Sequence, residues 1–223
     1  MHSVHKSRAK LGIVTDIVVS LTQGLRERKK QETLRRITDA GICLFIERGI
    51  DATTVDEIAA MAGISRRTFF LYLKSKDDIL LSLQSRMGDL IAERIRHADD
   101  TASPIDAVRT AVIDVCAQVP ADDLAAIDRL MRTSAAVQAR KQMTYVEQER
   151  RLVDGLRSRW PSPEREMALR LVAMLAMGAI RLATEALDQE GEQRSLVDLL
   201  HSTFDALIAE VTAPSDTRAL QQP

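Results

Sequence analysis

The sequence predicts an all-α fold. Ala and Leu dominate the composition, whereas only seven of the 223 residues are aromatic, so the chain is rich in helix formers and poor in residues that strands favour. Apolar residues recur at three- and four-residue spacing, which is the period of an amphipathic helix. No proline precedes Pro104, and the five prolines from Pro104 to Pro214 each fall where a helix is expected to begin or end.

The first two helices are predicted in the N-terminal third of the chain. An apolar face of helical period starts after Lys29, and Gly49 is expected to end this helix. Thr54 and Glu57 have the spacing of a capping box, in which each side chain satisfies a free backbone N–H at a helix start. The short second helix that follows is expected to end at Gly63.

Serine residues mark the start of the next two helices. Ser65 is predicted to cap a very short third helix, from Arg66 to about Tyr72. Ser75 is predicted to cap a fourth helix over 76–97, with two aspartates in its first turn, where the helix dipole favours negative charge. Further helices are expected near 104–119, 122–132, 134–159, 163–188 and 193–211, which makes about nine in all.

Composition and charge divide the chain into four segments. Residues 1–25 are expected to form a disordered or extended arm, and residues 214–223 a frayed tail. Residues 26–76 carry eleven Lys and Arg against seven Asp and Glu, a net charge of +4, whereas residues 77–223 carry −7. A basic N-terminal segment followed by an acidic remainder is the charge distribution expected of a chain that binds a polyanion at one end. We therefore expect a second domain over 77–213.

Two of the predicted helices and the tight turn over 63–65 have the layout of a helix-turn-helix. Gly63 suits the turn because a positive φ is unstrained only for glycine. Arg66 and Arg67 open the second of these helices, where guanidinium groups can form paired hydrogen bonds with guanine and the helix N-terminus attracts phosphate. Thr68 beside them can contact a phosphate or a thymine methyl group.

Further cations flank this helix in the sequence. Lys74 and Lys76 follow it, and four basic residues occur over 26–30. Each phosphate that such cations neutralise releases counterions, so binding to DNA should weaken steeply with salt.

Residues 35–80 resemble the DNA-binding domain of TetR-family (AcrR-like) transcriptional regulators. The likeness is carried by Ala40, Phe45, Arg48-Gly49, Thr53-Thr54-Val55-Asp56-Glu57-Ile58-Ala59, Ala62-Gly63-Ile64-Ser65, Thr68-Phe69-Phe70, Tyr72-Leu73 and Ser75-Lys76-Asp77. It implies an N-terminal three-helix DNA-binding domain, a C-terminal helical domain for effector binding and dimerisation, and a homodimer on a palindromic double-stranded operator. The sequence of residues 66–70 is similar to that of a branch of the family that includes regulators associated with mycofactocin and acyl-CoA metabolism. Five residues do not identify an effector, so we assign none.

Carried over position by position, the resemblance implies DNA contacts from Thr54, Ser65, Arg66, Arg67, Thr68, Tyr72 and Lys76. The residues at 66–68 are expected to read bases or phosphates, and those at 54, 72 and 76 to contact the phosphate backbone. The family usually has Tyr where this chain has Phe70, so that hydroxyl is missing and Phe70 is expected to pack. Phe69 and Leu73 follow the buried face and are expected in the core.

The last two predicted helices are the expected dimer contacts. The helix over 163–188 is apolar nearly all round, so it must be buried on more than one side, and its many alanines allow another helix to approach closely. The helix over 193–211 has one apolar stripe. Two such helices from each subunit would form a four-helix bundle about a two-fold axis; the alternative is that the same faces pack within one monomer.

An effector pocket is expected among the fourth and later helices, lined by Met87, Ile91, Val112, Cys116, Met131, Met143, Trp160 and Met174. Because few charged residues point inward, the effector is expected to be small and hydrophobic or amphipathic. By moving the fourth helix it would change the spacing of two recognition helices that must lie about 34–36 Å apart. The predicted function is thus a ligand-responsive repressor.

Two other classes of function stay open at this point. One is an all-α scaffold that binds a partner helix in a C-terminal groove, without specific DNA binding. The other is an α-helical enzyme, but no Gly-rich phosphate loop, HExxH motif or nucleophile elbow occurs. Glu93 and His97 have i,i+4 spacing, yet no third metal ligand is near in sequence. We therefore predict no catalytic residue, no cofactor and no metal.

The sequence also predicts a cytoplasmic location. Cys43 and Cys116 lie in apolar helical contexts without CxxC spacing, which is typical of buried thiols in a reducing compartment. No stretch approaches the roughly 18 consecutive apolar residues that span a bilayer, so no membrane contact is expected.

Overall fold

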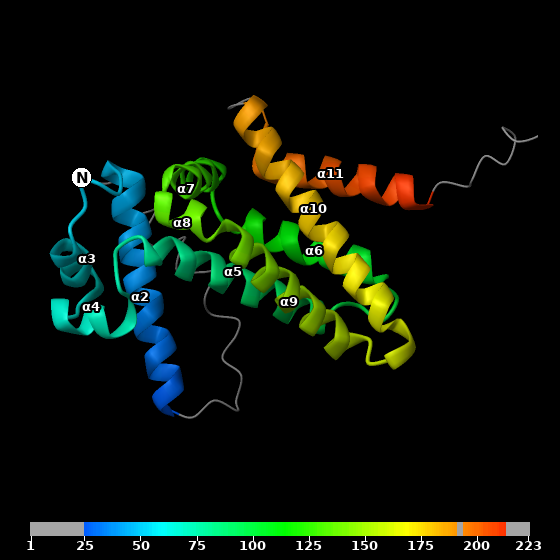
Figure 1. The fold of residues 1–223 in the computed structure, drawn as a ribbon, viewed down its shortest axis with the longest axis horizontal. Helices are drawn as coiled ribbons and strands as arrows, with labels where there is room; N and C mark the ends of the chain where they lie inside the picture. Colours follow the sequence, from blue (N-terminus) through cyan, green and yellow to red (C-terminus); the bar gives the residue numbers. More distant parts are fainter. Residues whose placement is uncertain (1–24, 191–193, 213–223) are drawn as a thin grey trace, which may run out of the picture.

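The computed structural model describes residues 25–190 and 194–212, and all regular structure in these residues is helical (Figure 1). The all-α prediction is confirmed. The predicted tail and all but the last residue of the predicted arm lie outside the described residues. The elements are α2 (Leu25–Arg48), α3 (Val55–Ala62), α4 (Arg66–Tyr72), α5 (Asp78–Arg96), α6 (Pro104–Ala117), α7 (Ala121–Thr133), α8 (Ala135–Ala139), α9 (Lys141–Arg159), a 3-10 turn (Pro163–Arg165), α10 (Glu166–Glu190) and α11 (Leu196–Thr212).

The predicted caps of α3 and α4 are confirmed. The Thr54 N–H donates to the Glu57 carboxylate at 2.8 Å, and the Glu57 N–H donates to the Thr54 hydroxyl at 3.3 Å. Gly63 then ends α3 with a φ of 66°. The Ser65 hydroxyl accepts from the Thr68 N–H at 3.0 Å and starts α4. These local hydrogen bonds fix the turn between the two helices.

The predicted Ser75 cap is wrong, because α5 begins at Asp78, two residues after the expected start at residue 76. The Asp78 carboxylate reaches back and accepts from the N–H groups of Lys74 and Ser75, at 2.9 and 3.1 Å. A side chain inside the first turn thus satisfies the loop donors, and the charge complements the helix dipole.

The single helix predicted over 134–159 is two helices with a break at Arg140, whose φ and ψ are −104° and 3°. No Gly or Pro marks this break. Its cause is tertiary: Val137 on α8 is buried in the core beneath α2 and α5, and the Arg140 guanidinium pairs with Asp78 at 3.0 Å. The chain therefore holds one helix more than expected among the described residues.

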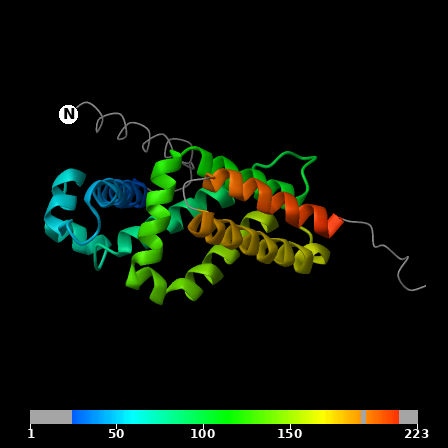
Figure 2. The same ribbon diagram turned by 90° about the horizontal axis from the view of Figure 1, so that it is seen from above.

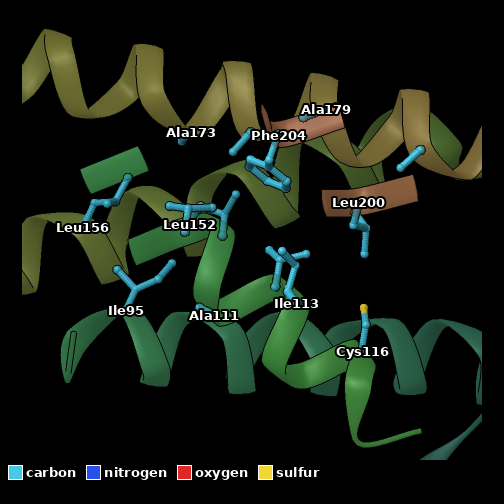
Figure 3. Close-up of a cluster of buried hydrophobic side chains, with 14 of the residues drawn as sticks. Ile95, Ala111, Ile113, Cys116, Leu152, Leu156, Ala173, Ala179, Leu200 and Phe204 are labelled. Carbon is cyan, nitrogen blue, oxygen red and sulfur yellow. The ribbon is translucent and has the colours of Figure 1, made fainter. Parts of the chain in front are cut away.

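Two large hydrophobic cores lie along the part of the chain that the structure describes, and α5 contributes to both. The N-terminal core comprises Ile37, Ala40, Ile42, Leu44, Phe45, Ile58, Ala62, Phe69, Leu73, Ile79, Leu80, Leu83, Ile127 and Val137. The C-terminal core is built from α5, α6, α7, α9, α10 and α11 and includes Ile95, Ala111, Ile113, Cys116, Leu152, Leu156, Ala173, Ala179, Leu200 and Phe204 (Figure 3). Helices α3 and α4 lie at one end of the molecule and α10 and α11 at the other, in both views (Figures 1 and 2).

Candidate nucleic-acid interface

Helix α4 is anchored by one side and presents the other to solvent. Phe69 is fully buried in the N-terminal core and Leu73 is 8% exposed, as predicted. Arg67 and Leu71 are both exposed, and each lies two residues from Phe69, which is about 200° around a helix of 3.6 residues per turn. The face that points away from the protein is therefore formed by Arg67 and Leu71.

The two arginines of α4 have different surroundings. Arg66 donates to the Asp56 carboxylate on α3 at 2.8 Å, and its guanidinium lies 5.5 Å from the centre of the Phe70 ring. Arg67 has no ion pair or hydrogen bond to any side chain that the structure describes. Arg66 is thus held at the side of α4 against α3, while Arg67 is free to extend.

Two of the hydroxyl groups predicted to contact DNA, those of Thr54 and Ser65, also cap helices, and a third, that of Thr68, bonds to the Ser65 hydroxyl. The hydroxyls of Ser65 and Thr68 lie 2.8 Å apart, so one of their two hydrogens is used between them and one is left for an acceptor. The Thr54 hydroxyl donates to Glu57 at 2.7 Å. A phosphate at Thr54 would have to compete with this carboxylate.

Glu57 is held ionised at the start of α3. Hydrogen bonds from the backbone and hydroxyl of Thr54 lower the pKa of Glu57, with a further contribution from Arg48 at 3.0 Å. The capping box is therefore intact at neutral pH.

The Lys76 ammonium points into the domain rather than toward solvent. It donates to the carbonyls of Ile50 at 2.6 Å and Thr53 at 3.1 Å, with a third carbonyl, that of Asp51, at 3.5 Å. An ammonium group has three hydrogens, so none is left for a phosphate in this arrangement. Lys74 is exposed instead. Tyr72 is partly buried against the N-terminal core.

Sequence reasoning missed two exposed apolar side chains on α4. Phe70 packs edge to face on Phe69, with ring centroids 5.3 Å apart, but it remains 46% exposed. Leu71 is 76% exposed. The helical period measured from Phe69 was the signal that could have placed Leu71 on the outward face.

The predicted effector residues do not all meet. Met131 packs on the N-terminal core, whereas Met143 and Met174 are 71% and 54% exposed. These three residues therefore do not line a pocket in the C-terminal core, contrary to the prediction. Helix α10 buries Ala173, Ala176 and Ala179, which leaves Met174 on its exposed side. The C-terminal core brings together Met87, Ile91, Val112, Cys116 and Trp160.

The described residues hold no group of three or more His, Cys, Asp or Glu side chains that could bind a metal. The His97 ring lies 2.9 Å from the Glu93 carboxylate at the end of α5.

Two parts of the chain match known protein families. Residues 37–83 match the model described as bacterial regulatory proteins, tetR family, and residues 102–212 match the MftR C-terminal domain. The chain is 34% identical over 95 residues to the HTH-type transcriptional repressor LfrR of Mycolicibacterium smegmatis, which is 43% of this chain and 47% of LfrR. It is 31% identical over 107 residues to the HTH-type transcriptional regulator TcmR of Streptomyces glaucescens, 47% of this chain and 46% of TcmR. The chain thus spans about half the length of these curated relatives.

Solved structures share the fold. FadR of Thermus thermophilus, a TetR-family transcriptional repressor in complex with lauroyl-CoA, has a TM-score of 0.56 and 22% identity, over 82% of this chain and 97% of FadR. SmeT, the repressor of the multidrug efflux pump SmeDEF of Stenotrophomonas maltophilia, has a TM-score of 0.55 and 19% identity, over 80% of this chain and 91% of SmeT.

Proposed function

Because the chain belongs to the TetR family, whose members are soluble DNA-binding transcriptional regulators and not enzymes, we propose that it is a ligand-responsive repressor. In this proposal a homodimer in the cytoplasm binds a palindromic operator, and a small apolar or amphipathic effector releases it. The DNA-binding unit comprises residues 26–76 together with the first turns of α5, which complete its core. The rest of the chain, to residue 213, binds the effector and the second subunit.

One observation supports the DNA-binding role above all others: Arg67 extends from the outward face of α4 without a partner among the described side chains. A scaffold protein gains nothing from a free guanidinium there, whereas a recognition helix uses it in the major groove. Exposed Lys29 and Lys30 at the start of α2, and Lys74 after α4, supply cations for the phosphates on the same domain.

The test is binding of the full-length chain to a randomised duplex pool and to the sequences enriched from it, at two salt concentrations. We expect a symmetric enriched motif and a steep fall in affinity with salt. Arg67→Ala should lose affinity for the motif, whereas Arg150→Ala, which removes another exposed guanidinium from α9, should not. Weak binding without sequence preference would favour the scaffold.

The outward face of α10 supports the dimer. Its exposed apolar residues recur at three- and four-residue spacing over most of the helix: Met167, Leu171, Met174, Leu175 and Leu182. The alanines Ala176, Ala179 and Ala183, expected to admit a partner helix, pack inside the monomer, as do Leu199 and Leu200 of the expected α11 stripe, whereas Val211 at the end of that stripe is 65% exposed. We therefore propose that the exposed Leu and Met face of α10 contacts the second subunit.

Length and composition alone would also allow the helix over Pro163–Leu187 to span a membrane, and only part of this helix is buried inside the protein. Its other side packs on α6, α9 and α11 as part of the C-terminal core. We therefore propose a second copy of this chain, not lipid, as the cover of its exposed face.

Helix α5 is the proposed route from effector to DNA. At its start Thr38 on α2 hydrogen-bonds Ser82 at 3.0 Å, and Asp39 pairs with Arg86 at 2.7 Å. Further along, a Cβ on Gly155 of α9 would lie 3.0 Å from the Ala92 carbonyl oxygen. Because α5 is fixed to both cores, a ligand that separates helices of the C-terminal core would shift α2 to α4 as well.

The effector proposal is tested with long-chain acyl-CoA, since solved proteins of this fold hold lauroyl-CoA and stearoyl-CoA. We expect a rise in melting temperature and a loss of operator binding. If neither changes at saturating acyl-CoA, an acyl effector is excluded.

A further inference from the structure

Leu71 is the most exposed large hydrophobic side chain that the structure describes, at 76%. A single exposed leucine is ordinary on a protein surface. This one, however, lies one helical turn from Arg67, on the face of α4 directly opposite the buried Phe69 ring. In the proposed complex that face points into the major groove.

The other residues of α4 contact neighbouring side chains, and the Thr68 hydroxyl lies 2.8 Å from that of Ser65. Arg66 is tied to Asp56 and covers Phe70, and Phe70 leans on Phe69. Tyr72 packs against the N-terminal core. The groups that reach straight outward are therefore one guanidinium and one isobutyl side chain, from Arg67 and Leu71.

The two groups suit different base edges. A guanidinium can donate two hydrogen bonds to O6 and N7 of guanine. A leucine side chain offers no donor or acceptor, and the C5-methyl of thymine is the apolar group that bases present in the major groove. Residues four apart on a helix are separated by about 5–6 Å, and base pairs by about 3.4 Å, so the two side chains reach base pairs no more than two apart.

We propose that Arg67 and Leu71 together select a guanine and a nearby thymine in each operator half-site, with Leu71 packing on the thymine methyl group. This inference rests on the proposed function, because it assumes that α4 enters the major groove.

The experiment begins with motifs enriched from a randomised duplex pool by the wild-type chain, by Leu71→Ala and by Val146→Ala. Val146 is 60% exposed on α9 and provides the matched control. We expect the wild type and Val146→Ala to enrich the same motif, and Leu71→Ala to lose the thymine preference at one position per half-site while it keeps the guanine.

The second step replaces that thymine with deoxyuridine, which removes only the methyl group. Loss of one buried methyl corresponds to about fourfold weaker binding by the wild type. Leu71→Ala should bind both duplexes equally, and deoxyuridine at other thymines of the motif should have no effect. Circular dichroism checks that each variant is folded.

The outcomes separate the two proposals. A motif that tolerates deoxyuridine at every thymine, or a Leu71→Ala variant that keeps the thymine preference, overturns this inference and leaves the regulator intact. If the wild-type chain enriches no motif, sequence-specific binding fails and this inference fails with it.

Discussion

The Arg66 guanidinium lies 2.8 Å from the Asp56 carboxylate, and this pair ties the start of α4 to the first turn of α3. Both side chains are more than half exposed. The carboxylate lies beside the face that we propose for DNA, where it repels phosphates, and Arg66 offsets that repulsion.

Asp56→Asn should therefore strengthen DNA binding. With the carboxylate gone, Arg66 is released to a phosphate, and affinity for any duplex should rise a few-fold at low salt, with a steeper salt dependence. Fluorescence anisotropy over a salt series measures both. Asp154→Asn, which removes a similarly exposed carboxylate on α9, is the control. Weaker binding by Asp56→Asn would show that the pair is needed to position α4.

Lys76 and Lys74 should behave differently when each is replaced by Met. Lys76→Met removes the cation from the Ile50 and Thr53 carbonyls and should lower the free energy of unfolding by about 1–3 kcal/mol. Lys74→Met should leave stability unchanged and reduce the salt slope of DNA binding by about 0.9. Urea unfolding and salt titrations measure the two effects. A reduced salt slope with unchanged stability in Lys76→Met would return Lys76 to the DNA contacts.

Local motifs were predictable from the sequence. The capping box at Thr54, the turn glycine Gly63 and the Ser65 cap each depend on residues within four positions of one another, so their hydrogen bonds follow from spacing. The burial of Phe69 and Leu73 followed from the helical period.

Features set by distant contacts were not predictable. The break at Arg140 depends on Asp78, 62 residues away, and the direction of Lys76 on carbonyls more than 20 residues earlier. Helix α10 is apolar on nearly every side, so its sequence did not reveal that Ala173 and Ala176 face inward and Leu171 outward. Met174 was misplaced in the pocket for the same reason.

Leu171→Glu tests the dimer. Leu171 is 50% exposed in the monomer, so the charge should leave the monomer folded but should be intolerable in an apolar interface. Sedimentation should show a dimer for the wild type and a monomer for Leu171→Glu, with weaker operator binding. Val146→Glu should remain dimeric. A monomeric wild type, or a dimeric Leu171→Glu, contradicts the proposed interface.

Burial raises the pKa of the Cys116 thiol from 9.0 to about 11. Between these values the unfolded chain loses the proton while the folded chain keeps it, so stability falls as the pH rises above about 9, by about 1.4 kcal/mol per pH unit, and levels off above about 11. Urea unfolding measures the free energy of unfolding at pH 8 and at pH 10.5. Between these pH values it should fall by about 2 kcal/mol more for the wild type than for Cys116→Ala. Equal losses would show that the thiol does not titrate differently on folding.

Methylation interference on an enriched operator tests the central claim most directly, because methylation of guanine N7 blocks only contacts made in the major groove. We predict one guanine in each half-site whose methylation prevents binding of the wild-type chain and no longer matters for Arg67→Ala. Binding that is unaffected by methylation at every guanine, or an interference pattern that Arg67→Ala shares with the wild type, would contradict a base contact by Arg67.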